Sequence, residues 1–463
     1  VTLPFPVQFD HINSSFIELS VYISTANVDT HLRPLTSLFL DALFTLPVQT
    51  KDGLIPYEDI VKKLSEDTVD YHASLGTSVG FREIATIGLK VEAAKYVNAI
   101  QWIKDVLWNT KFTPERLKIT ASKILNDIPQ TKRDGRGMAN STMRALQFER
   151  QKSTNASSNV LYQAKYLPEL LQRLEKDPQS VLDDCEKFRH ALINSPAFTV
   201  HVVGDILKLP NPRSAFKIFN EAKKANEAAK LSSYPWARDV LNSKGKNPGQ
   251  IGMVVSLPSI ESSFSLHSAA GPESYTSADI APLLVLNEVL ETMEGIFWKL
   301  IRGQGLAYSC TLRADVEAHL IYFSVYRSPN AYKAFLQARN VIYQLKDKQL
   351  DIEDSAIDGA KSGVIFSIVN REDTISHAAI QSFTNQILKK VKATYNRDLL
   401  KQVQETTKAD LHRVLNKYLV ALFEPKQSNV VVVSSPGKVN EIAEGFKSLG
   451  FDMNTASLDD VIE

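Results

Sequence analysis

The residues best suited to chemistry lie in the segment Leu300-Ile-Arg-Gly-Gln-Gly-Leu-Ala-Tyr-Ser, where a predicted helix leads into a predicted strand. Its two glycines permit a tight turn, so Arg302 and Tyr308 are expected to emerge from either side of it. Arginine supplies a permanent forked donor and tyrosine a directional hydroxyl donor, which together suit a carbonyl oxygen that gains negative charge. A structural alternative stays open, in which Arg302 complements the helix dipole and Tyr308 is an amphipathic strand residue.

An internal repeat is expected to position this turn. Alternation in residues 16–24 predicts a strand, followed by helix 34–44, helix 57–64, extended segments 68–74 and 86–91, and further helices. The second half replays this order with extended segment 263–268, helix 278–301, extended segments 306–313 and 319–326, and a helix that starts at Ser328-Pro329. Equivalent elements are about 230 to 250 residues apart, a plausible length for a domain.

The predicted fold class is therefore α+β, with two homologous domains, each a mixed, mostly antiparallel sheet with helices packed on one face. The first domain is predicted over residues 1–232 and the second, which carries the Arg302/Tyr308 turn, over 251–463. The polar, Pro-, Gly- and Asn-rich stretch 233–250 is predicted to link them.

Residues 129–159 form a second polar stretch that contains Asp134-Gly-Arg-Gly. We expect a mobile loop that joins two helices, with a helix over 143–150 as the alternative. Its cluster of Lys132, Arg133 and Arg136 is interpreted as a solvated loop rather than a binding patch.

Composition excludes several classes of partner. The 463 residues carry a formal net charge of +1, which gives no electrostatic footprint for nucleic acid or an anionic membrane. No apolar run approaches the roughly 18 to 20 residues that span a bilayer. The two cysteines suggest no disulfide framework and favour a reducing compartment. The start Val-Thr-Leu-Pro-Phe-Pro is interpreted as a cut end rather than a natural start.

Several segments resemble the C-terminal half of pitrilysin/insulinase-type metallopeptidases, of the inverzincin class. They are Arg302-Gly-Gln-Gly-Leu-Ala-Tyr, Arg313-Ala-Asp-Val-Glu-Ala-His-Leu-Ile-Tyr-Phe-Ser, Tyr326-Arg-Ser-Pro-Asn-Ala-Tyr-Lys-Ala-Phe and Leu54-Ile-Pro-Tyr-Glu-Asp-Ile-Val. The sequence is most similar to the presequence-protease-like branch and its cytosolic fungal relatives.

This resemblance implies four α/β domains in two bowl-shaped halves that close around an unfolded peptide. The zinc would be held by an inverted His-x-x-Glu-His helix in an N-terminal half that this sequence does not contain. The resemblance assigns to Arg302 and Tyr308 the contacts with the substrate carbonyl and backbone near the scissile bond.

The zinc motif itself is not found in this sequence. An inverted motif needs two histidines one helical turn apart, with a glutamate as base. At the equivalent positions of the first repeat stand Leu38, Asp41 and Ala42, and the second repeat reads Leu284-Val-Leu-Asn-Glu-Val-Leu. We therefore expect no metal in this chain, and no peptide cleavage by this chain alone.

Two functions are compatible with these observations. The chain could complete a zinc metalloendopeptidase, with the N-terminal zinc-bearing half of the same protein and an unfolded peptide as its partners. It could instead be a metal-free peptide-binding or scaffold subunit, resembling the non-catalytic subunits of mitochondrial processing peptidase or the core proteins of a respiratory complex. No nucleic acid or membrane partner is expected. The resemblance favours the cytoplasm, with the mitochondrial matrix as the alternative.

Overall fold

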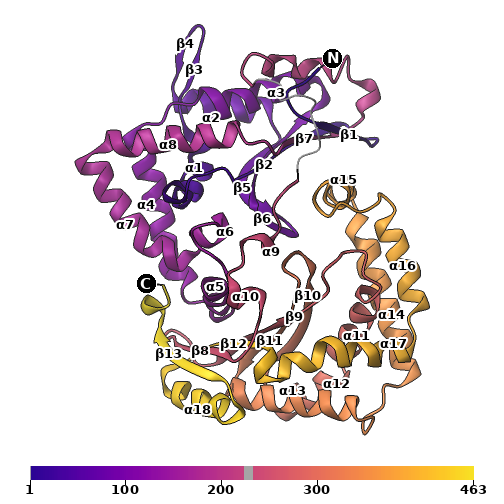
Figure 1. Ribbon diagram of the computed structural model, residues 1–463. Coiled ribbons are helices and arrows are strands. Elements are labelled where there is room, and N and C mark those ends of the chain that lie inside the picture. Colours follow the sequence, from indigo (N-terminus) through magenta and orange to yellow (C-terminus); the bar gives the residue numbers. More distant parts are fainter. Residues whose placement is uncertain (1, 224–232, 463) are drawn as a thin grey trace.

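The computed structural model describes residues 2–223 and 233–462. Its strands form two large sheets, one from each half of the sequence, and a small separate hairpin (Figure 1). The first sheet has the order β1-β7-β2-β6-β5, and only its β1–β7 pair is parallel. The strand bounds are Val7–His11 for β1, Phe16–Ser24 for β2, Asp70–Thr77 for β5, Gly80–Glu92 for β6 and Phe198–Gly204 for β7, with β3 (Val48–Thr50) and β4 (Gly53–Ile55) in the hairpin.

The second sheet repeats this topology. Its order is β10-β11-β9-β12-β8-β13, with parallel pairing of β12 with β8 and of β8 with β13. Without β13, the order matches the first sheet, since β8 to β12 take the places of β1, β2, β5, β6 and β7. The strand bounds are Ile251–Ser256 for β8, Ser263–Ala270 for β9, Ser309–Asp315 for β10, Leu320–Ser328 for β11, Asn429–Ser434 for β12 and Asp452–Ser457 for β13. The predicted internal repeat is thus present as a repeated strand order.

Helices cover one face of each sheet, as the fold class predicted. Ile17, Leu19 and Val21 of β2 are fully buried against this helical layer, because alternate strand residues share one face. The helices of the first half are α1 (Thr36–Ala42), α2 (Tyr57–Asp67), α3 (Tyr96–Lys104), α4 (Pro114–Thr131), α5 (Gly135–Gln147), α6 (Thr154–Ser157), α7 (Val160–Lys176) and α8 (Pro178–Ile193). Those of the second half are α11 (Ile280–Glu291), α12 (Ile296–Leu300), α13 (Ala331–Lys346), α14 (Asp354–Val369), α15 (Ile375–Phe383), α16 (Tyr395–Glu405), α17 (Lys408–Val414) and α18 (Val439–Leu449).

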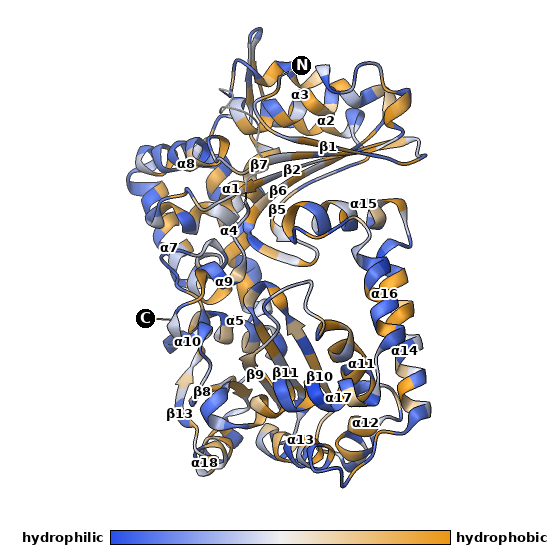
Figure 2. Cartoon of the chain, turned by 45° about the vertical axis from the view of Figure 1, so that its right-hand side comes forward, coloured by the Kyte–Doolittle hydropathy of each residue, from blue (hydrophilic) through white to orange (hydrophobic). Residues whose placement is uncertain are grey.

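The opposite face of each sheet receives a helix from the other half of the chain. Helix α5 packs on β9 and β12, where Met143 joins an apolar cluster with Leu266 and Val431. Helix α15 lies against the first sheet (Figure 2), and its Phe383 ring stacks on Tyr22 at a centroid distance of 4.1 Å. The two halves are therefore interlocked by reciprocal helices.

The prediction of a mobile loop over residues 129–159 is wrong. Helix α4 continues to Thr131, and α5 follows after a short turn, because the Asp134 carboxylate accepts a hydrogen bond from the Arg136 N–H at 3.1 Å and caps the helix. A Cβ on Gly135 would lie 2.2 Å from the Phe264 ring. That glycine lets the helix approach the second sheet, so it serves packing rather than flexibility.

The predicted continuous helix over 278–301 is also wrong, because it is broken between α11 and α12. Glu294 has a positive φ of 62°, and a Cβ on Gly295 would lie 2.7 Å from the Thr292 carbonyl oxygen. Because of this break, α12 is a separate short helix that leads into the turn containing Arg302.

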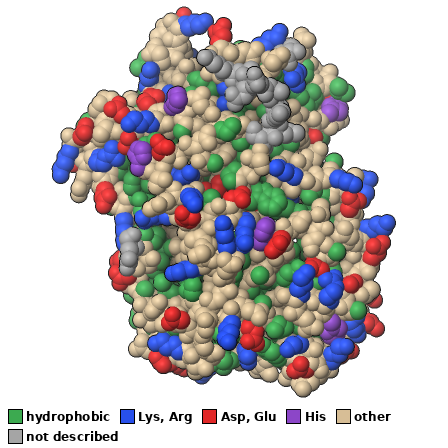
Figure 3. All heavy atoms as spheres, viewed as in Figure 1, with side chains coloured by type: hydrophobic (Ala, Val, Ile, Leu, Met, Phe, Trp, Pro, Cys, Tyr) green, Lys and Arg blue, Asp and Glu red, His purple; other side chains and the backbone are tan. Residues whose placement is uncertain are grey.

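The domain boundaries at 232 and 250 stay a prediction, and residues 224–232 lie outside the described part of the chain. Within the predicted linker, α9 (Ala237–Val240) and α10 (Ser243–Lys246) are short helices. No helix among residues 2–223 and 233–462 is both long and apolar enough to cross a membrane. On the face shown in Figure 3, acidic and basic side chains are interspersed.

Candidate functional site

The turn after α12 brings Arg302 and Tyr308 together. A single 3-10 turn over Arg302–Gln304 ends at Gly305, whose φ of 72° is in the left-handed region that favours glycine. The Tyr308 N–H then donates to the carbonyls of Tyr326 at 3.1 Å and Arg327 at 2.9 Å, which aligns the chain with β11 just before β10 starts. The glycine turn and the strand pairing thus fix the two side chains relative to each other.

The Arg302 guanidinium lies between two aromatic rings. Its Cζ is 4.0 Å from the centroid of the Trp298 ring and 4.3 Å from that of the Tyr308 ring. Such stacking uses the flat face of the guanidinium and holds the side chain in place. The N–H groups at its edge stay able to donate hydrogen bonds. Tyr308 is 52% exposed, so this pair presents donors to the solvent.

The stack continues beyond the two residues that the sequence predicted. The Tyr308 ring meets the Tyr326 ring edge-on at 6.0 Å, and the Arg136 Cζ lies 4.0 Å from the Tyr326 centroid. We call Trp298, Arg302, Tyr308, Tyr326 and Arg136 the guanidinium–aromatic stack. Its members come from α12, the turn, β11 and α5, so the first half of the chain contributes to it.

Arg136 was interpreted as part of a solvated loop, and this is wrong, since it lies on α5 and stacks on Tyr326. Lys132 instead pairs with Asp459 at 3.5 Å. Among the described residues, no carboxylate pairs with Arg302 or Arg136. Both charges are therefore available to an acceptor from outside the chain.

Leu38, Asp41 and Ala42, the positions predicted to be equivalent to a zinc motif, lie on α1. Leu38 and Ala42 are 1% and 0% exposed and belong to the core of the first half, whereas Asp41 is exposed. Two apolar side chains that face the core supply no metal ligand. In the described ranges, no group of three or more His, Cys, Asp and Glu could hold a metal ion.

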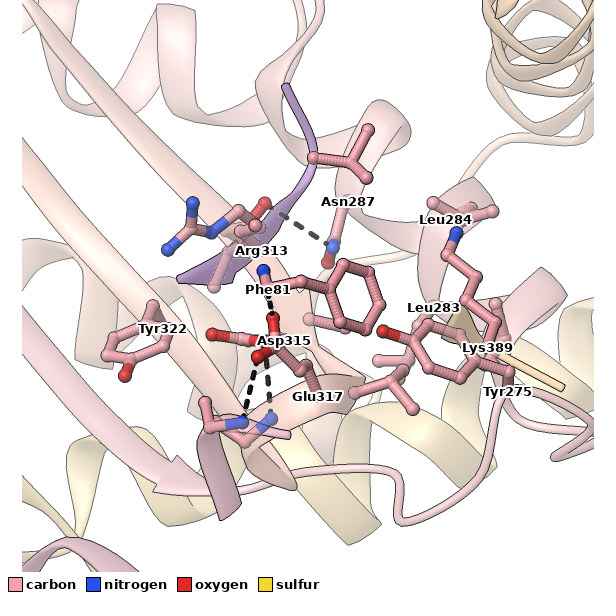
Figure 4. Close-up of a pocket in the computed structure, with 18 of the residues that line it drawn as sticks. Phe81, Tyr275, Leu283, Leu284, Asn287, Arg313, Asp315, Glu317, Tyr322 and Lys389 are labelled. Atoms are coloured by element: carbon pink, nitrogen blue, oxygen red, sulfur yellow. Dashed lines mark hydrogen bonds between the residues drawn. The ribbon is translucent and has the colours of Figure 1, made fainter. Parts of the chain in front are cut away.

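A pocket of about 840 Å³ lies between the two halves of the chain (Figure 4). Its walls come from the tips of the equivalent hairpins β5–β6 and β10–β11 and from helices α5, α11 and α14. Arg302 and Tyr308 do not line it. The sequence-predicted pair and this pocket are separate features.

Glu317 joins the two hairpin tips beside this pocket. Its carboxylate accepts hydrogen bonds from the N–H groups of Phe81 at 2.9 Å and Ala237 at 2.8 Å. A Cβ on Gly80 would lie 2.8 Å from Glu317 Oε1, so the close approach depends on a glycine. Burial raises the pKa of Glu317 to about 7.

Glu83 is a second buried acidic residue at the pocket, on β6 of the first sheet. It accepts hydrogen bonds from the Ser153 hydroxyl at 3.0 Å and from the N–H groups of Thr154 at 2.6 Å and Asn155 at 3.0 Å. Burial nevertheless raises its pKa to about 7. Asp315 likewise accepts from the Ala318 N–H at 3.3 Å, and burial raises its pKa. These carboxylates are already occupied by donors of the chain.

No signal in the sequence predicted this pocket. Its polar residues come from β6, α5, α11 and β10, which are far apart in the chain, and they form no recognisable motif. Two features alone could have indicated that β6, α5, α11 and β10 come together. They are the Asp134-Gly pair that starts α5 and the repetition of the two hairpins.

Comparison with known proteins places these features in context. No protein-family model matches the sequence. An uncharacterized protein of Schizosaccharomyces pombe is 30% identical over 468 residues, which cover 98% of this chain and 45% of that protein. An uncharacterized protein of Saccharomyces cerevisiae is 28% identical over 474 residues, covering 99% of this chain and 45% of that protein. The chain thus spans about half the length of the curated relatives it matches.

Solved structures share the fold. A protease from Helicobacter pylori aligns with a TM-score of 0.67 and 14% identity, covering 94% of this chain and 98% of that chain. The peptidase M16 inactive domain from Pseudomonas fluorescens aligns with a TM-score of 0.65 and 15% identity, covering 93% and 95%. A conserved protein from Enterococcus faecalis V583 aligns with a TM-score of 0.67 and 11% identity, covering 93% of this chain and 96% of that chain. The chain therefore shares its fold with these three solved structures, one of which is a peptidase M16 inactive domain.

Proposed function

We propose that this chain is the zinc-free half of a metalloendopeptidase, and that it supplies substrate contacts through Arg302 and Tyr308. The observation that carries the proposal is the pair itself, in which the half-buried Arg302 guanidinium, without a carboxylate partner among the described residues, contacts Trp298 and the exposed Tyr308. Donors fixed in this way can stabilise a carbonyl oxygen as it gains charge, with little reorganisation.

Three further observations support the proposal. The fold is that of a peptidase M16 inactive domain. Leu38 and Ala42 offer no ligands, so the metal and its water would belong to another part of the protein. The curated relatives are about twice as long as this chain, which leaves room for a second half of similar size. That half is the proposed partner, extended peptides are the proposed substrates, and the cytoplasm is the proposed compartment.

The test uses the full-length protein and a quenched fluorescent peptide. We expect Arg302→Ala and Tyr308→Phe each to lower turnover by about ten-fold or more, because each removes a donor to the reacting carbonyl. Tyr308→Phe keeps the ring that stacks on Arg302, so it isolates the hydroxyl. Arg133→Ala is the matched control, since Arg133 is exposed in the turn before α5 and outside the stack.

Unchanged turnover in both variants would refute the assignment of these two residues. If the full-length protein binds the peptide with micromolar affinity and never cleaves it, even with added zinc, the peptide-binding subunit is the better description.

A further inference from the structure

The pocket between the two halves has an unusual distribution of donors. Arg82 of β6, Arg144 of α5 and Arg313 of β10 all line it. None of these three guanidiniums forms an ion pair with a described carboxylate, although Asp315 and Arg313 attract each other at longer range. Arg313 also lies over the Tyr322 ring at 5.4 Å, so Arg82 and Arg144 are the two arginines here for which the described residues provide neither an ion pair nor an aromatic ring.

Arg144 and Arg82 lie close enough to repel each other. Partial burial and the charge of Arg82 lower the pKa of Arg144 to about 10, whereas Arg82 itself is exposed to solvent. Two neighbouring guanidiniums are stabilised when an anion lies between or beside them. Glu83 and Glu317 accept their hydrogen bonds from N–H and hydroxyl groups of the chain and not from these two arginines.

A buried amide adds another unused donor. The Gln147 side chain is 1% exposed and lines the pocket. Its Oε1 accepts a hydrogen bond from the Tyr322 hydroxyl at 3.1 Å, whereas its buried Nε2 has no partner among the described residues. Buried donors are rarely left unpaired, so this amide points to an acceptor from outside the chain.

The opposite end of the pocket differs, as Figure 4 shows by the separation of Lys389 from Arg313. Lys389 lies over the rings of Tyr275 at 4.9 Å and Tyr395 at 5.8 Å, and Arg371 donates to the Asn396 amide oxygen at 3.4 Å. These cations already have partners. The unused donors are concentrated at the arginine end.

We propose that the arginine end of this pocket binds a carboxylate, and that its natural source is the free C-terminal end of a peptide. Val79, which is 46% exposed, and the half-buried Leu284 line the same pocket and can pack against apolar side chains of that peptide. A volume of about 840 Å³ accommodates several residues. A bidentate arginine–carboxylate pair would use the fork geometry of a guanidinium. The assignment to a peptide rests on the proposed function, whereas the carboxylate site itself does not.

The test measures binding to this chain without cleavage, so it does not depend on catalysis. Isothermal titration at about pH 7 and low salt compares an acetylated Ala/Leu pentapeptide that has a free C-terminal carboxylate with the same peptide amidated. We expect the acid to bind at least about ten-fold more tightly, given the strength of charge-assisted hydrogen bonds. Sodium phosphate alone is the third probe.

Two variants locate the site. We expect Arg82→Gln and Arg144→Gln each to reduce the acid-to-amide ratio about ten-fold, and Arg133→Gln, which lies outside the pocket, to leave it unchanged. Arg82 is exposed, so its variant reports on binding even if Arg144→Gln fails to fold. Thermal unfolding of each variant checks this.

Equal binding of acid and amide would overturn the carboxylate site, as would equal ratios in Arg82→Gln and the parent chain. If phosphate binds as tightly as the acid peptide, the site holds a small anion and the peptide assignment is wrong. None of these outcomes alters the prediction for Arg302 and Tyr308, so the two proposals fail separately.

Discussion

Single side chains carry the link between the halves, and Glu317 is the clearest case. We expect Glu317→Ala to lower the free energy of unfolding by about 2–4 kcal/mol, because it leaves the buried N–H of Phe81 and the partly buried N–H of Ala237 unpaired. Urea denaturation measures this. Glu273→Ala is the control, since Glu273 is exposed and should stay within about 0.5 kcal/mol. A similar small change for both would contradict the role of Glu317.

At the same scale, the sequence predicted that Arg302 and Tyr308 would emerge close together, and they do. The spacing of neighbouring residues was enough for this prediction, because the conformation of a short glycine turn depends on residues adjacent in sequence. It could not predict Tyr326 and Arg136 beside them. Those residues reach the stack through sheet pairing and through helix α5, which a local pattern does not encode.

At the scale of elements, α15 holds the second half of the chain onto the first sheet. Its Phe383 is fully buried and stacks on Tyr22 and on His201 at 5.0 Å. We expect Phe383→Ala to cost about 3–5 kcal/mol. Hydrogen exchange should show loss of protection first in residues 375–388, since this segment would detach before the sheets unfold.

A matched substitution on the neighbouring helix tests this interpretation. Phe366 of α14 is 68% exposed, so Phe366→Ala should change stability by no more than about 0.5 kcal/mol. If Phe383→Ala and Phe366→Ala change stability equally, or if hydrogen-exchange protection falls uniformly along the chain, α15 does not hold the two halves together by itself.

The whole molecule should lose stability as pH rises from about 5 to 8. Burial raises the pKa of Glu83 and Glu317 to about 7 and of Glu291 to about 8, from 4.5. The folded chain therefore holds protons that the unfolded chain has released, and the stability is lost as pH rises through the folded values. Each carboxyl contributes up to about 1–3 kcal/mol.

Asp279 sets the acidic limit. Burial raises its pKa, but hydrogen bonds from Tyr418, Arg413 and Lys417 outweigh this and hold the pKa well below its usual range. Its contribution is present at neutral pH and is lost as pH falls through that low value. Chemical denaturation at several pH values should place the maximum on the mildly acidic side. Glu291→Gln should flatten the decrease towards pH 8, and an unchanged slope would count against the buried carboxyls as its cause.

The sequence by itself determined the fold class, the order of elements along each half, the repeat and the glycine turn that carries Arg302 and Tyr308. These depend on local periodicity, turn residues and residue type, which neighbouring positions fix. Only the tertiary structure decided that α5 packs on the second sheet and α15 on the first. It also decided that Arg82, Arg144 and Arg313 line one pocket. Burial against a distant sheet stabilises these arrangements, and no spacing along the chain reveals which distant surface a helix will cover.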